Sequence, residues 1–77
     1  MIANYEVRPL KSGTGFYPCF PSAYGPEDCG PVFATEALAD AWGRLRRRLT
    51  IVRAEGNGVA AHEVWCELEK VSRLACD

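Results

Sequence analysis

The sequence has a single histidine, a single methionine and no pair of cysteines in Cys-x-x-Cys spacing. One histidine, His62, cannot build a metal site alone, and a catalytic triad would also require a placed nucleophile. Without Cys-x-x-Cys, the strong sequence signals for zinc and for thiol redox chemistry are missing. We therefore expect no enzyme, no cofactor and no metal.

Long apolar runs are also missing. No stretch approaches the roughly 20 apolar residues that a membrane span needs. The N-terminus lacks the basic start and apolar run of a secretory signal. We expect a cytoplasmic protein that does not bind membranes. The formal net charge of −1 gives no overall attraction to nucleic acid.

The 77 residues, of which 48% are hydrophobic and 25% charged, predict one globular domain spanning residues 1–77. A chain of this length buries only about 60–65% of its unfolded surface, so its core is thin. Small domains often gain stability by self-association. A monomer and a homodimer both remain open.

The first third has the pattern of a β-hairpin. Tyr5 and Val7 alternate with polar residues, the turn cluster 11–15 follows, and the aromatic segment 16–20 forms the second strand. Because Pro18 cannot donate to a ladder, we expect this strand at an edge of the sheet. Prolines and glycines mark 21–31 as a loop, and Val32–Phe33 is a candidate third short strand.

The second half has the pattern of a helical hairpin. Thr35 is the predicted N-cap of a helix that runs to about Glu55 and ends at Gly56-Asn57-Gly58. A second helix begins near Val59. Their buried stripes are predicted to be Leu38, Trp42, Leu45, Leu49 and Val52, and Ala61, Val64, Trp65, Leu68, Val71 and Ala75. The predicted class is α+β, with the N-terminal hairpin packed on the helices.

One alternative concerns residues 50–54. Thr, Ile and Val favour strands, and Asn57-Gly58 is typical of a tight hairpin turn. Thr50–Arg53 can therefore be interpreted as a strand instead of the last turns of the helix.

Five arginines give the middle of the chain a basic character. On a helix, Arg44, Arg47 and Arg48 share one face, with Asp40 one turn before Arg44, while Arg46 and Arg53 share another. Guanidinium groups suit carboxylates and phosphates, so these are candidate contacts to a partner. An ordinary solvated helix face is the alternative. Phe20 and Tyr24 are further candidates for contacts, or for packing.

The cysteines allow one close pair. Cys66 and Cys76 lie about 15 Å apart along an intact helix and cannot meet. Cys19 and Cys29 flank the loop and can approach each other as free thiols, as a disulfide or as metal ligands. Free thiols are the simplest interpretation in the cytoplasm.

Two resemblances bear on function. Residues 54–68 resemble the C-terminal part of some bacterial antitoxins, in which a turn like Glu55-Gly56-Asn57-Gly58 precedes a helix with a core like Glu63-Val64-Trp65-x-x-Leu68. The chain as a whole resembles in type the small proteins of phages and other mobile genetic elements, including anti-CRISPR proteins. Its hairpin and its helix with Trp42 carry this resemblance, which implies that the protein covers a surface of a CRISPR effector in the bacterial host cell.

We therefore expect a stoichiometric protein-binding inhibitor that blocks a CRISPR effector complex from binding target DNA. The candidate contacts are Arg44, Arg46, Arg47, Arg48, Arg53, Phe20 and Tyr24. The alternative is an antitoxin-like or regulatory module that binds a toxin or DNA. Acidic protein is favoured over nucleic acid as the partner, since the net charge is slightly negative and no aromatics alternate with the arginines.

Overall fold

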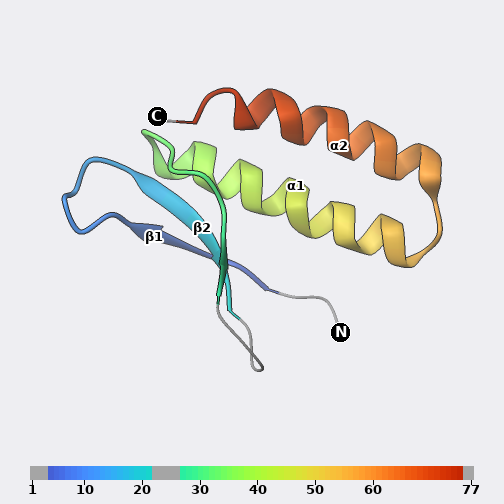
Figure 1. Cartoon of the computed structure of the whole chain (residues 1–77), viewed down its shortest axis with the longest axis horizontal. Helices are drawn as coiled ribbons and strands as arrows, with labels where there is room; N and C mark the ends of the chain where they lie inside the picture. Colours follow the sequence, from blue (N-terminus) through green and yellow to red (C-terminus); the bar gives the residue numbers. More distant parts are fainter. Residues whose placement is uncertain (1–3, 22–26, 76–77) are drawn as a thin grey trace.

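The structure is a computed structural model that describes residues 4–21 and 27–75. Three strands come first, and two helices follow: β1 (Glu6–Pro9), β2 (Phe16–Phe20), β3 (Asp28–Cys29), α1 (Glu36–Ala54) and α2 (Gly58–Ser72). Helix α1 lies between the sheet and α2, and it contacts β1, β2 and α2 (Figure 1). The predicted α+β architecture, with an N-terminal hairpin and a C-terminal helical hairpin, is confirmed.

Strands β1 and β2 form the predicted antiparallel hairpin. Gly13 lies in its turn with φ of 76°, a conformation that glycine adopts without strain. The position predicted for the third strand, Val32–Phe33, is wrong: β3 is Asp28–Cys29, which pairs with β2. Phe33 forms only an isolated bridge with Phe16. The two segments stay separate because Pro31, between them, has no N–H to continue a ladder.

The prediction that β2 lies at an edge is also wrong, since the strand order is β1-β2-β3. Leu10 N–H donates to Gly15 C=O at 2.8 Å, so these two residues form a hydrogen-bonded pair. Along an antiparallel hairpin, such pairs alternate with pairs that have no backbone hydrogen bonds between them. Pro18, opposite Val7, falls in a pair without such bonds. The backbone nitrogen of Pro18 therefore points away from β1, toward the β3 side. On that side the Pro18 carbonyl accepts a hydrogen bond from Gly30 N–H, just after the end of β3, at 2.8 Å. The missing donor therefore leaves the hairpin ladder intact.

Helix α1 begins at the predicted cap, where Thr35 Oγ1 accepts a hydrogen bond from Leu38 N–H at 3.2 Å. It continues through Thr50–Arg53, which confirms the helical interpretation of that segment. Val52 in this segment is buried against α2, and such packing outweighs the weak strand preference of β-branched residues. Gly56, with φ of 74°, follows the end of the helix.

The two helices pack through part of the stripes that their periodicity predicts. The buried cluster consists of Leu49, Val52, Val64 and Leu68, surrounded by Trp42, Leu45, Ala60 and Ala61. Leu38 and Val71 are only half-buried, and Ala75 lies beyond α2, which ends at Ser72. Trp65 departs furthest from the prediction, because 43% of it is exposed. It lies one residue, or about 100°, from buried Val64 and so falls at the margin of the contact with α1.

Aromatic side chains join the sheet to α1. The ring centroid of Phe20 lies 5.7 Å from that of Tyr5 and 6.5 Å from that of Trp42. The ring of Trp42 also lies on Gly30, where an added Cβ would meet Trp42 Cζ3 at 2.6 Å. Within residues 4–21 and 27–75, no helix is long and apolar enough to cross a membrane.

Candidate functional site

The arginines of α1 form two surfaces, as their spacing predicts. Arg46 and Arg53 lie within about 20° of each other around the helix axis, whereas Arg48 is turned about 160° away from Arg46. Two of the hollows that they line follow this division. Arg46 and Arg53 line a groove together with residues of α2, and Arg44, Arg47 and Arg48 line a separate hollow. A third, smaller pocket is lined by Arg46 and Arg47 together.

The outer arginine face consists of Arg44, Arg47 and Arg48. All three are exposed, and with Leu45 and Ile51 they border a hollow of about 250 Å³. Asp40, one turn before Arg44, forms an ion pair with it, with Arg44 Nη2 2.9 Å from Asp40 Oδ2. In the described part of the chain, Arg47 and Arg48 have no recorded ion pair.

The tryptophan–arginine groove lies on the other flank of α1, against α2. It has a volume of about 310 Å³ and is lined by Trp42, Arg46, Arg53, Trp65, Leu68, Glu69 and Ser72. The guanidinium carbon of Arg53 lies 5.9 Å from the ring centroid of Trp65, within range of a cation–π interaction. Trp42 Nε1 of α1 donates to Ser72 Oγ of α2 at 2.8 Å, which fixes the orientation of the Trp42 ring between the two helices. The groove thus combines exposed aromatic surface with two arginines and one carboxylate, that of Glu69, which leaves an excess of one positive charge.

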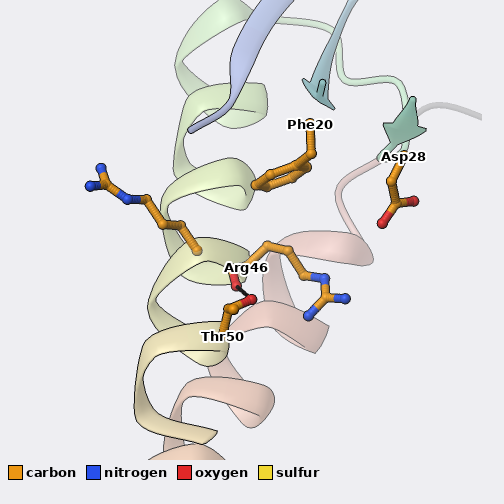
Figure 2. Close-up of a pocket in the computed structure, with 5 residues that line it drawn as sticks. Phe20, Asp28, Arg46 and Thr50 are labelled. Carbon is orange, nitrogen blue, oxygen red and sulfur yellow. Dashed lines mark hydrogen bonds between the residues drawn. The ribbon is translucent and has the colours of Figure 1, made fainter. Parts of the chain in front are cut away.

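Arg46 reaches a second, smaller pocket. This pocket of about 130 Å³ is lined by Phe20, Asp28, Arg46, Arg47 and Thr50. Figure 2 shows the side chains of Arg46 and Asp28 extending into the same space beneath Phe20. No ion pair between Arg46 and Asp28 is recorded, so the Arg46 guanidinium keeps its donors for another acceptor.

The two candidate aromatics differ from the arginines. Phe20 is half-buried between Tyr5 and Trp42, which favours the packing interpretation over a role as an exposed anchor. Tyr24 lies outside the described residues. Among the residues that the structure describes, the exposed aromatic is Trp65, which the periodicity assigned to the buried stripe.

A cluster of two cysteines and a glutamate lies on the face of the sheet that points away from α1. Cys19 and Cys29 are opposite each other on β2 and β3, with their Sγ atoms 2.8 Å apart. The thiol of Cys19 also donates to Glu27 Oε2 at 3.0 Å. Both cysteines are free thiols in the structure, so the predicted approach of the pair is confirmed, whereas the contribution of Glu27 was not predicted.

Arg8 holds Glu27 over the cysteines. Its guanidinium bonds both carboxylate oxygens of Glu27 and also reaches Glu6 Oε2 at 3.1 Å. The hydrogen bonds from Arg8 and then from Cys19 lower the pKa of Glu27, and the bond with Glu27 raises the pKa of Arg8. Burial, followed by the hydrogen bonds with Cys29 and Glu27, raises the pKa of Cys19 to about 12. Cys19 is therefore a thiol at neutral pH and Glu27 a carboxylate.

His62 is exposed on α2, with Nε2 3.7 Å from Cys66 Sγ. The two residues are one helical turn apart, which by itself accounts for their contact. No third group that could ligate a metal joins them among the described residues, where Cys19, Glu27 and Cys29 are the only such group of three.

Comparison with protein-family models found no match, and comparisons with curated proteins and with solved structures found no significant match. The surfaces described above are therefore the basis for inferring function. Among them, the tryptophan–arginine groove and the cysteine–glutamate cluster each join residues from separate segments of the chain.

Proposed function

We propose that the protein acts by stoichiometric binding of another protein, and that an acidic segment of the partner occupies the tryptophan–arginine groove. The observation that supports this is the presence of two tryptophans and two arginines in one hollow. Tryptophan and arginine are among the residues that contribute most binding energy at protein interfaces. Because guanidinium groups bind carboxylates bidentately, Arg46 and Arg53 favour an acidic segment. Trp65 offers it an apolar contact.

A CRISPR effector subunit is the first partner to test, since the chain resembles anti-CRISPR proteins in type. Inhibition would be steric: the bound protein would cover the surface through which the effector binds target DNA. This mechanism requires a one-to-one complex and no chemical step.

The test is direct binding of the full chain to purified effector subunits, measured by calorimetry. In one variant Arg46→Glu and Arg53→Glu are combined, which reverses both charges of the groove. The matched control combines Arg44→Glu and Arg48→Glu, which makes the same change of charge on the opposite flank. Interface hot spots contribute about 2 kcal/mol or more each. We therefore expect the groove variant to lose about 100-fold or more in affinity and the control to lose about threefold or less.

Trp65→Ala provides a second test without a change of charge. Because 43% of Trp65 is exposed, the variant should fold, as circular dichroism can verify, but should bind the partner weakly. Equal losses in the groove variant and its control would overturn the groove as the site. Binding to a toxin or to duplex DNA in place of an effector would support the antitoxin-like alternative. For DNA, the logarithm of affinity should fall linearly with the logarithm of salt concentration.

A further inference from the structure

The outer face of the sheet gathers ligand atoms of the kind that zinc prefers. The Sγ atoms of Cys19 and Cys29 and a carboxylate oxygen of Glu27 all lie within 4.8 Å of one another. Thiolate sulfur and carboxylate oxygen are both common ligands of zinc, and thiolates select it over magnesium and calcium. We propose that Cys19, Glu27 and Cys29 bind one zinc ion, with a fourth coordination position open to solvent.

The strand pairing explains why these residues converge. Gly30 N–H donates to the Pro18 carbonyl, so the neighbouring pair, Cys19 and Cys29, has no hydrogen bonds between its backbones. Side chains are closest in pairs of this kind. Glu27 is two residues before Cys29, and residues at this spacing in an extended segment point to the same side. Two adjacent segments thus supply three ligands to one face.

The charge of the cluster favours a cation. With both thiols ionised, Cys19, Glu27 and Cys29 carry three negative charges. Arg8 contributes one positive charge, which it shares with Glu6, so the cluster stays negative and a divalent ion offsets two of its charges. Arg8 also donates hydrogen bonds to both carboxylate oxygens of Glu27 and so orients this ligand. In known zinc sites, the residues that hydrogen-bond the metal ligands orient them in the same way.

Metal binding exchanges protons for zinc. Each S–H bond breaks, its proton passes to the buffer, and a sulfur–zinc bond forms. The Cys19 proton now points at Glu27 Oε2, so its loss frees a lone pair on that oxygen for the metal. Sulfurs bound to tetrahedral zinc at about 2.3 Å lie about 3.8 Å apart. The two Sγ atoms, now 2.8 Å apart, must separate, and the exposed side chain of Cys29 has room to move outward.

The experiment is titration of the reduced, metal-free full chain with cobalt(II), followed by displacement with zinc. Cobalt bound to thiolates in a tetrahedral site absorbs through sulfur-to-cobalt charge transfer and intense d–d bands. We expect these bands to saturate at one cobalt per chain and to disappear when zinc is added. Zinc content after dialysis, measured by mass spectrometry, should also be one per chain.

Three variants locate the site. Cys29→Ser should weaken cobalt binding about 100-fold or more, and Glu27→Gln should weaken it about tenfold or more. Cys66→Ser is the matched control, because it removes a cysteine that lies next to His62 on α2, and it should bind cobalt like the parent chain. Circular dichroism verifies that each variant is folded. Absence of thiolate bands, their persistence in Cys29→Ser, or a Cys19–Cys29 disulfide that survives the reductant would overturn the proposal.

Discussion

The ring of Tyr5 lies directly on the backbone of Gly43. A Cβ atom added to Gly43 would meet Cδ2 of Tyr5 at 2.5 Å and Cε2 at 2.6 Å. Such distances are too short for real contacts, so β1 can approach α1 this closely only because position 43 has no side chain. The Tyr5 hydroxyl, in turn, reaches Asp40 one turn earlier on α1. The contacts of Tyr5 with Gly43 and Asp40 thus determine how closely the sheet packs against α1.

Gly43→Ala should therefore destabilise the protein. Alanine at a helical position contributes about 1 kcal/mol relative to glycine, but overpacking a tight contact typically costs about 1–3 kcal/mol. We expect a net loss of about 1 kcal/mol in the free energy of unfolding, measured by urea denaturation. Gly58→Ala is the control, since no atom lies within 4 Å of its added Cβ, and it should be neutral or stabilising. If both variants behaved alike, the Tyr5–Gly43 contact would not limit the approach of β1.

The periodicity of the sequence predicted the helices well because their determinants are local. Thr35 caps α1 with its own side chain, and Leu49, Val52 and Val64 recur at the spacing that buries one face. The role of Gly43 could not be anticipated in this way, because it depends on Tyr5, which precedes β1 and lies far away in the chain. Nothing in the helix pattern distinguishes it from a glycine that merely weakens a helix.

The wrong predictions about the sheet, namely the edge position of β2 and the position of the third strand, also arise because these features depend on contacts between distant segments. Pro18 lies opposite Val7 of β1 and bonds Gly30, which directly follows β3. Only this register shows that the missing donor of Pro18 is harmless to the hairpin. For the candidate site, arginine spacing predicted two faces correctly, but it could not show that Trp65 borders one of them. The position of Glu27 beside Cys19 likewise follows from the pairing of β2 with β3, which no local pattern specifies.

Tyr5→Phe should change how stability depends on pH. The Tyr5 hydroxyl donates to Asp40 Oδ1 at 2.7 Å, and partial burial, followed by this bond, raises the pKa of Tyr5 above its ordinary value of about 10. The folded state thus favours the protonated phenol. The resulting stability is complete below about pH 10 and is lost as pH rises through the folded pKa.

The variant should lose about 1 kcal/mol of stability at neutral pH, since one hydrogen bond is removed, and this deficit should shrink in alkali. Urea denaturation across the alkaline range measures both effects. Tyr17→Phe is a suitable control, because the Tyr17 hydroxyl donates no hydrogen bond to another described residue, and it should change the stability at neutral pH by less than about 0.5 kcal/mol. A constant deficit for Tyr5→Phe at all pH values would contradict the role assigned to the Asp40 contact.

The turn between the helices should be sensitive to Asn57. Its side-chain oxygen accepts a hydrogen bond from Ala60 N–H at 3.1 Å and so satisfies a backbone donor at the start of α2. Asn57→Ala should reduce the free energy of unfolding by about 1 kcal/mol. Thr50→Ala, on the exposed surface of α1, removes only a bond to the carbonyl of Arg46 and should change stability by less than about 0.5 kcal/mol. A negligible effect of Asn57→Ala would show that solvent replaces the cap.

The two cysteines that face each other across β2 and β3 should differ in reactivity toward alkylating reagents. Cys19 is fully buried and its pKa is raised to about 12, whereas Cys29 is exposed. The thiolate is the reactive species, so at neutral pH iodoacetamide should modify Cys29 at least about tenfold faster than Cys19.

Peptide mapping by mass spectrometry gives the two rates separately, and a chelator during the reaction keeps both thiols free of metal. In urea, Cys19 and Cys29 should be alkylated at similar rates, because unfolding removes both the burial and the hydrogen bonds of Cys19. Equal rates in the native protein would mean that β3 separates from β2 faster than alkylation proceeds. The two-residue strand would then contribute little to the stability of the sheet without a metal ion to hold it.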